Sequence, residues 1–409
     1  MEQTKYKLQK KLIINISIII LSRLLLNTSR RFIYTFAAAF SRGLGVPLTS
    51  ITSLIAINQG TSVLGILFGP LGDQLGYKLM ILIGMTCLTV GTLAAGILPF
   101  YGVIAAAMFL TGLGKSIVDP AIQAYAGQRV PYHRRGLVIG MMELGWAGST
   151  LIGIPLMGIL IEKLGWQAPF LAIGLASLLL AILIAIFFPK DQKTNRSGAP
   201  LNETLNFWKQ IMGNRAAVGV LLFALFIAIA NDAIFVVYGA WLEDSFNLSI
   251  IALGFSTGVI GIAEVSGEAL TAFFADKIGL KRSIFLGLLA LAISFMLLPL
   301  ADKNLTFALI GLFFIFVSFE FTFVTSMSLS TELAPGSRAT MMSAFYAIAG
   351  VGHMIGAILG GIAWSMGKLV GTSVLATSFT VLAIFALIWG IWSWKRQAPN
   401  YNYHPDEVK

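Results

Sequence analysis

The chain has 409 residues and a formal net charge of +10, and 57% of its residues are apolar while only 11% are charged. Soluble globular domains carry about 25% charged residues, so the composition excludes a water-soluble protein and a soluble catalytic domain. In such a chain the positive charge reports on orientation in a membrane, and not on nucleic acid. The single cysteine, Cys87, excludes a disulfide within the chain.

The first apolar run begins near residue 13, after Lys10 and Lys11. A cleaved signal peptide is the alternative to a retained helix here, but Arg23, Arg30 and Arg31 interrupt the apolar core that a signal peptide needs. A bilayer-spanning helix takes about 20 apolar residues. Runs of this kind predict twelve transmembrane helices, near 13–40, 48–69, 79–98, 101–126, 137–162, 167–188, 216–241, 248–274, 281–300, 304–331, 338–366 and 372–394.

The longest polar stretch separates the sixth predicted span from the seventh. It predicts an N-terminal six-helix bundle at 1–189, a cytoplasmic linker at 190–215, and a C-terminal bundle with a short tail at 216–409. With the N-terminus inside, 20 of the 28 Lys and Arg residues lie on the cytoplasmic side, and the outer loops hold only Arg42, Lys163, Lys303 and Lys368. Because Lys and Arg concentrate in cytoplasmic loops, this split predicts that both termini are cytoplasmic.

A short pattern recurs in the two halves at an offset of 203 residues. An aspartate is followed by a glycine three residues later and a lysine two residues after that, as Asp73, Gly76 and Lys78 and again as Asp276, Gly279 and Lys281. Pro131–Arg134 likewise matches Pro335–Arg338. The repeat predicts two halves of like topology, which is a plan that many transporters use.

The loop from Gly69 to Lys78 resembles motif A of the major facilitator superfamily. Gln74 and Tyr77 stand where the family usually has bases. A capped turn between two helices is the alternative reading of one copy alone, but the second copy favours the family.

Span 5 resembles motif C, a glycine and proline signature that the family associates with antiporters. Its residues here are Gly145, Gly148, Gly153, Pro155 and Gly158, with Ile154 where glycine is usual. Close helix packing is the alternative explanation of so many small residues. The arginine of the family's motif B has no counterpart, because Met108 stands at its place.

The resemblance covers nearly the whole chain and implies an all-α polytopic membrane protein, with twelve helices in two pseudo-symmetric six-helix bundles around a central cavity. It implies alternating access in the cytoplasmic (inner) membrane of a bacterium, among lipids and as a monomer. The residues expected to control the conformational change are Gly69, Asp73, Gly76, Lys78, Asp276, Gly279, Gly153 and Pro155.

Polar residues within a span are costly in lipid and normally face a cavity or a partner. In span 1, Arg23, Asn27, Arg30 or Arg31, and Tyr34 recur every three or four residues and therefore share one helical face. This arginine stripe indicates an anionic or zwitterionic small-molecule substrate. The alternatives are that the arginines pair with internal carboxylates, or that Arg30 and Arg31 extend toward the interface.

Six acids lie within the predicted spans against four bases, so at least two acids lack a basic partner and are candidates for the coupling proton. Glu264 and Glu268, one turn apart in span 8, are the first candidates. In span 4, Lys115 and Asp119 form either an internal ion pair or, with Gln123, part of a site at which binding of substrate or of a proton to Asp119 releases Lys115. Span 7 adds Asn231 and Trp241 to the expected substrate site. Asp232 in span 7 is the next candidate for a proton or cation site, and Glu320 in span 10 is a reserve proton site. His353 is expected to be a neutral packed histidine.

No phosphate loop, metal-ligand cluster or nucleophilic triad is recognisable in the sequence, so no enzyme, cofactor or metal is expected. The sequence predicts a secondary transporter that exports a small organic solute or amphiphile in exchange for protons. Proton-coupled uptake of an organic anion is the first alternative. A non-transporting membrane sensor with the same fold and a channel are the others.

Overall fold

The computed structural model describes residues 2–129, 142, 145–189, 213–333 and 338–392, and these residues are almost entirely helical. The first half contains α1 (Glu2–Thr35), α2 (Ala37–Leu44), α3 (Leu48–Gly60), η1 (Thr61–Leu64), α4 (Gly65–Leu75), α5 (Tyr77–Ile97), α6 (Tyr101–Arg129), η2 (Ser149–Gly153), α8 (Ile154–Leu164) and α9 (Ala168–Phe187).

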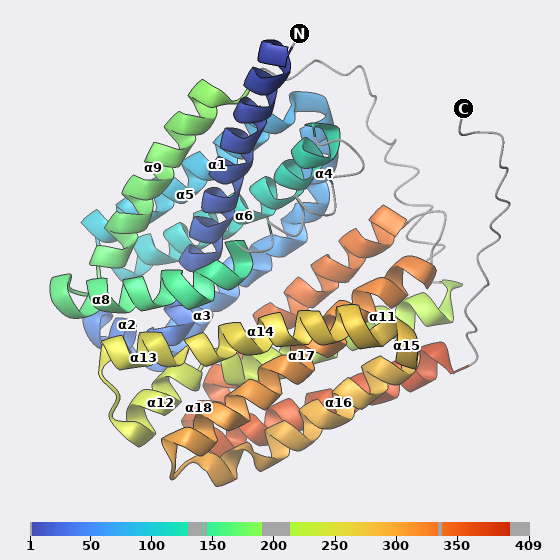
Figure 1. Cartoon of the computed structure of the whole chain (residues 1–409). Coiled ribbons are helices and arrows are strands. Elements are labelled where there is room, and N and C mark those ends of the chain that lie inside the picture. Colours follow the sequence, from blue (N-terminus) through green and yellow to red (C-terminus); the bar gives the residue numbers. More distant parts are fainter. Residues whose placement is uncertain (1, 130–141, 143–144, 190–212, 334–337, 393–409) are drawn as a thin grey trace, which may run out of the picture.

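The second half contains α11 (Arg215–Phe235), α12 (Tyr238–Phe246), α13 (Ile250–Ser256), α14 (Gly258–Leu270), η3 (Thr271–Ala275), α15 (Asp276–Ile278), α16 (Leu280–Leu297), η4 (Leu298–Ala301), α17 (Leu305–Leu333) and α18 (Arg338–Ile391). Figure 1 shows the two halves as separate groups of helices. They meet where α2, α8, α12 and α13 lie, and they diverge away from there.

The number of spans in the described residues agrees with the prediction of twelve. Ten helices are long and apolar enough to cross a membrane, and the bent pair Ala37–Leu44 and Leu48–Leu64 gives an eleventh span. The tenth helix, Met341–Ile391, contains non-helical dihedral angles at Gly367 and Lys368, which divide it into two. The predicted fold class, an all-α polytopic membrane protein, is confirmed.

Several boundaries differ from the prediction. The first span does not run straight to residue 40, because α1 ends at Thr35 and Phe36 has dihedral angles outside the helical range. The predicted loop at 69–78 is wrong over most of its length: α4 continues to Leu75, and Gly76 alone separates it from α5. The predicted linker lies largely outside the described residues, as do Pro131–Arg134 and most of Pro335–Arg338.

The outer surface of the helices is apolar. On α9, large side chains that recur every three or four residues are exposed, namely Leu175, Leu178, Leu179, Ile182 and Ile186. A patch of this kind is unfavourable in water but matches the hydrocarbon core of a bilayer. The polar residues of the spans therefore lie on the faces that the helices turn toward one another.

The internal repeat has the same backbone geometry in both halves. Gly76 has φ +95° and ψ +144°, and Gly279 has φ +94° and ψ +132°. L-residues rarely adopt a positive φ of this kind, so glycine is required at both turns. After each turn a lysine donates to carbonyl oxygens at the end of the last helix of its own half. Lys78 Nζ lies 2.8 Å from Ala185 O and 2.6 Å from Phe188 O, and Lys281 Nζ lies 2.8 Å from Ile391 O.

Because Lys78 and Lys281 make matching contacts, we expect that replacing either one lowers the stability of the protein by the same amount. A cation at a helix C-terminus contributes about 0.3–1 kcal/mol, so Lys78→Ala and Lys281→Ala are each expected to lower the unfolding temperature of the purified protein by a few degrees or less. The double variant is expected to show the sum, because the two sites lie in different halves. Thermal unfolding in detergent measures this. A large loss in one single variant only would contradict the equivalence of the two halves.

Candidate functional site

The two halves contact each other along α3 and α18 and pack most closely toward one end of the molecule, which we call the closed end. It comprises α2, the start of α3, α8, α12 and α13. Arg42 of α2 pairs with Glu243 of α12 at 2.6 Å. Ile251 N of α13 donates to Glu162 Oε2 of α8 at 3.0 Å. These contacts join the first half to the second.

Glycines allow the backbones to approach closely at the closed end. A Cβ atom added at Gly239 of α12 would lie 2.0 Å from Thr35 O of α1, and one at Gly254 of α13 would lie 3.3 Å from Pro155 Cα of α8. Near the start of α3, Gly361 of α18 faces Thr52 in the same way. Small residues are the usual means of close helix packing in lipid.

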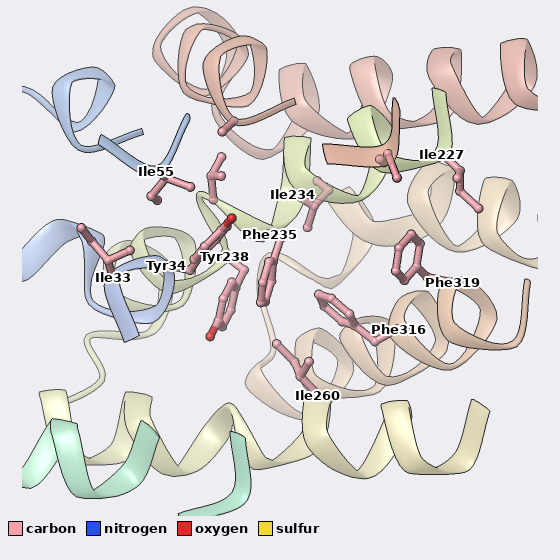
Figure 2. Packing of buried hydrophobic residues seen from close by; sticks show 14 of the residues in the cluster. Ile33, Tyr34, Ile55, Ile227, Ile234, Phe235, Tyr238, Ile260, Phe316 and Phe319 are labelled. Carbon is pink, nitrogen blue, oxygen red and sulfur yellow. The ribbon is translucent and has the colours of Figure 1, made fainter. Parts of the chain in front are cut away.

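An aromatic and hydroxyl cluster continues the contact toward the centre. The Tyr34 ring lies 4.6 Å, centroid to centroid, from the Phe235 ring in a tilted arrangement, and Phe235 stacks on Tyr238 at 5.4 Å. Figure 2 shows these rings side by side, with Phe316 of α17 on the side of Phe235 away from Tyr34. The Tyr238 hydroxyl also bonds to Thr35 Oγ1 at 2.6 Å. The buried core is thus continuous between the halves.

The strongest polar contact between the halves is a buried ion pair. Arg31 of α1 forms two hydrogen bonds with the Glu264 carboxylate of α14, and Arg31 Nη1 to Glu264 Oε2 measures 3.0 Å. Arg31 also donates to Thr150 Oγ1 of η2, and its guanidinium lies 4.2 Å from the ring centroid of Trp146. The two side chains are 7% and 4% exposed. A two-pronged pair of this kind is strong and fixed in direction.

A second polar cluster lies within the first half. Lys115 of α6 donates to Asp119 Oδ2 and to Asn27 Oδ1, both at 2.7 Å. Arg23 Nε lies 4.0 Å from Asp119 Oδ1. The ion pair between Lys115 and Asp119, one of the two arrangements considered from the sequence, is therefore present. Asn27 is buried, and its Nδ2 donor has no hydrogen-bond partner among the described residues.

A third polar group connects α1 to the second half through α3. Arg30 donates to Gln59 Oε1, and Gln59 Nε2 donates to the Tyr34 hydroxyl. The Tyr34 hydroxyl lies 3.5 Å from Asp232 Oδ2 of α11. Asp232 Oδ1 lies 3.1 Å from His353 Nδ1 of α18 and 3.3 Å from Asn231 Nδ2. This group therefore runs from a cation of the first half to a carboxylate of the second.

Not all of the predicted site residues belong to these three groups. Gln123 is exposed on α6. Trp241 is fully buried at the closed end, where its indole nitrogen donates to Asp302 Oδ1 at 2.6 Å. Glu268 is half-buried, one turn after Glu264. Glu320 of α17 is half-buried and attracts Arg31 electrostatically.

The residues expected to control the conformational change fall in two places. Gly153 and Pro155 lie in η2 and α8, beside the closed end. The others lie away from the closed end (Figure 1). Gly69 and Asp73 are in α4, and Gly76 and Lys78 are at the turn into α5. Asp276 is the first residue of α15, and Gly279 directly follows its last residue.

Four contacting residues were not predicted from the sequence: Gln59, Trp146, Thr150 and His353 as a partner of Asp232. Gln59 follows Asn58 in an otherwise apolar span, which is a signal of the same kind as the arginine stripe. Trp146 and Thr150 carry no such signal, because a tryptophan or threonine in a span is unremarkable.

A pocket of about 540 Å³ opens at the closed end between the halves. Its lining includes Arg42, Leu48, Glu243, Asp244, Trp364 and Lys368. Its charges are paired with each other, since Lys368 Nζ lies 3.0 Å from Asp244 Oδ2 and Arg42 pairs with Glu243. The pocket is therefore a shallow, charge-balanced depression over the contact between the halves.

Comparison with known proteins gives a consistent result. A family model described as Major Facilitator Superfamily matches residues 19–231 and 220–407. The uncharacterized MFS-type transporter YceJ of Bacillus subtilis is 24% identical over 323 residues, which are 79% of this chain and 81% of the relative. The multi-drug resistance efflux pump PmrA homolog of Lactococcus lactis is 22% identical over 381 residues, 90% of each chain. The sialic acid transporter NanX of Escherichia coli is 25% identical over 224 residues, 54% of each.

Solved structures show the same fold. A bacterial homolog of the human lysosomal transporter Spinster, in an inward-facing and unoccupied conformation, has a TM-score of 0.77 at 13% identity, over 93% of this chain and 96% of that one. A peptide transporter POT in complex with sulfate has a TM-score of 0.77 at 12% identity, over 91% and 93%.

Proposed function

Because the chain belongs to the major facilitator superfamily and is a secondary transporter, we propose that it moves a small organic anion or zwitterion together with a proton by alternating access. The observation that carries this proposal is the buried ion pair between Arg31 and Glu264. The pair joins α1 of the first half to α14 of the second, so any event that breaks it acts directly on the contact between the halves.

The pair supports binding of a proton and an anion together. While Glu264 is ionised, it occupies the guanidinium of Arg31. Protonation removes the negative charge, and Arg31 is then available to an anionic group. Each ligand therefore favours binding of the other, which is positive coupling through a shared equilibrium. Together they replace the contact that holds the closed end, and the halves can separate there.

The first half supplies the remaining part of an anion site. Its spans contain four bases, Arg23, Arg30, Arg31 and Lys115, but only two acids, Asp119 and Glu143. Asn27 Nδ2 is a buried donor without a partner among the described residues, and it lies one turn before Arg30 on α1. A buried donor without a partner costs about 1–3 kcal/mol. An acceptor group of the solute at this position offsets that cost.

We infer a location in a bacterial cytoplasmic membrane with both termini in the cytoplasm. The closed end then faces outward, and the arrangement of the halves favours access from the cytoplasm. In this orientation the Glu264 proton and the solute leave or enter on the same side, and the direction of net transport follows the two gradients. A monomer contains every residue of the proposed site.

Export of a solute in exchange for protons is the second candidate. It is favoured by the close packing of the motif C-like segment, since Pro155 of α8 lies against Gly254 of α13 at the contact between the halves. The similarity to the efflux pump homolog of Lactococcus lactis also supports it. In this case the proton and the solute bind alternately, and binding of one weakens binding of the other.

The sign of proton movement distinguishes the two candidates. The purified chain is placed in liposomes with a pH indicator inside, and carboxylates including sialic acid, zwitterionic amino acids and amphiphilic cations are added outside in turn. We expect an organic anion to enter and the interior to become more acidic. Exchange predicts the opposite sign, and both signs are independent of how the protein is oriented. If no solute of the panel moves, the result would favour a non-transporting sensor. Solute movement that does not saturate and moves no protons would favour a channel.

Arg30→Ala tests the anion site in the same assay. A hydrogen bond to a charged group contributes about 1.5–3 kcal/mol, so we expect the half-saturating concentration of the anion to rise at least about tenfold. Arg282→Ala, which removes an exposed arginine of α16, is the matched control and is expected to behave as the unmodified chain. Equal effects of the two changes would show that the loss reflects overall charge.

A further inference from the structure

Asp232 is a buried carboxylate that lacks an arginine or lysine partner. It is 1% exposed. Among the described residues, its basic neighbour is His353, whose Nδ1 lies 3.1 Å from Asp232 Oδ1 without hydrogen-bond geometry, and its other polar neighbours are Asn231 and the Tyr34 hydroxyl. A buried charge without a counter-charge is strongly unfavourable. The site therefore needs a proton on one of its two titratable members.

The charged groups on the packed elements do not supply that counter-charge. From α1, Arg30 bonds to Gln59 and Arg31 bonds to Glu264, while Tyr34 contributes a neutral hydroxyl. From α3 the neighbour is the amide of Gln59. Glu320 of α17 and Glu264 of α14 act on Arg31, and both are acidic. His353 of α18 is thus the one base facing Asp232 within ion-pair distance in the part of the chain that the structure describes.

We propose that Asp232 and His353 form a second proton-binding site, separate from Glu264, which holds one proton in this arrangement and releases it when the halves move. Two forms are neutral overall: a protonated Asp232 beside a neutral His353, and an ionised Asp232 beside a protonated His353. Each contains one proton, which belongs to the pair. No bond is formed or broken other than those to this proton.

The surroundings of this site include both halves, so its proton affinity depends on how they are arranged. Asp232 and His353 belong to the second half, but the Tyr34 hydroxyl that faces Asp232 belongs to the first. Met354, the residue after His353, packs against Gly60 at the end of α3, where an added Cβ would lie 3.0 Å from Met354 Sδ. A movement between the halves changes these contacts. By linkage, proton binding at the pair then biases that movement, and this role rests on the proposed function.

Infrared difference spectroscopy tests the proton site without any solute. The full chain is placed in phosphatidylethanolamine and phosphatidylglycerol vesicles, and spectra are compared between about pH 5 and about pH 8, the interval in which histidine-linked protons exchange. We expect Asp232→Asn to remove one carboxyl component that Glu264→Gln retains. In His353→Gln the Asp232 component is expected to remain.

Two results would overturn the proposal. One is a difference spectrum of Asp232→Asn that matches the unmodified chain in its carboxyl, carboxylate and histidine bands, provided that gel filtration shows folded protein. The other is a change in the Asp232 component when sodium chloride replaces a salt of a large organic cation at constant pH and constant ionic strength. Such a change would make the pair a metal-cation site. A failure of solute-driven proton movement alone, with the Asp232 component present, would instead count against the proposed function.

A second measurement tests the coupling to the movement of the halves. Thr52, buried between α3 and α18, is replaced by cysteine in a Cys87→Ser background as a reporter of opening at the closed end. Because the thiolate is the reactive form, labelling is expressed relative to that of a free thiol at the same pH. We expect the remaining pH dependence to persist in Glu264→Gln and to disappear when Asp232→Asn is added. Persistence in the double variant would show that the pair does not bias the movement.

Discussion

Replacing Glu264 with glutamine is expected to remove the Glu264 proton from the transport cycle, so that solute-driven proton movement falls to what the pair of Asp232 and His353 carries. The amide is nearly the same size and still accepts a hydrogen bond from Arg31, but it cannot take up a proton in this pH range. The proton then has no site on the contact between the halves. Because counterflow of unlabelled against labelled solute needs no proton, exchange is expected to continue. The measurements are internal pH and solute counterflow in the same vesicles.

Glu268→Gln is the matched control for this prediction. Glu268 belongs to the same helix one turn later, but the hydrogen bonds of Arg31 go to Glu264 and Thr150. We expect proton movement in this variant to remain within about twofold of the unmodified chain. A half-buried charge that is not part of the ion pair between Arg31 and Glu264 contributes about 1 kcal/mol or less of interaction free energy. Loss of coupling in Glu268→Gln with coupling retained in Glu264→Gln would reverse the assignment of the two carboxylates.

Gly239→Ala is expected to open the closed end. The added Cβ would lie 2.0 Å from Thr35 O, which is a backbone atom of the other half, so no side-chain rotation can relieve the contact. Overpacking of this kind costs about 1–3 kcal/mol, which corresponds to a shift of about 5- to 150-fold in a two-state equilibrium. Labelling of the Thr52→Cys reporter is expected to accelerate by a factor in this range.

Gly258→Ala is the control, because an added Cβ at Gly258 of α14 meets no atom within 4 Å. Labelling of the reporter in this variant is expected to equal that of the parent. If Gly239→Ala also leaves labelling unchanged, then the contact at Thr35 does not limit the separation of the halves, and the closed end is held by other contacts.

Most of the fold could be predicted from the sequence, because the signals that specify it are local. Apolar runs specify spans, and the recurring Asp, Gly and Lys positions specify two halves whose turns at Gly76 and Gly279 have the same backbone geometry. The errors fall where a helix continues without a change in composition. The residues 69–75 contain two glycines and a proline, yet they form the end of α4, because glycine and proline are tolerated inside membrane-spanning helices, where neighbouring helices and side chains satisfy the freed backbone groups.

The candidate site could be predicted only in part. The arginine stripe of α1 is visible at spacings of three and four, and so is the pair of Lys115 and Asp119, because both are regularities within one helix. The partner of Arg31 is not visible, since Glu264 lies 233 positions away. The predicted spans contain six acids and four bases, and composition alone does not determine which acid pairs with which base. The sequence predicts a packed neutral His353, because Asp232, which lies 3.1 Å from it, belongs to another helix.

Because the contacts between the halves are closest at one end, a rotation of one half about that end moves its distant atoms much further than its near ones. A helix of 20 residues is about 30 Å long. A half that turns by roughly 10° about the closed end therefore displaces its far end by about 5 Å, whereas atoms near the fulcrum move by less than the length of a hydrogen bond. Arg31 and Glu264 lie near the closed end, so they move by only a small distance. A movement that breaks one ion pair at the closed end is thus accompanied by a much larger movement at the opposite end, which narrows the passage there while the closed end opens.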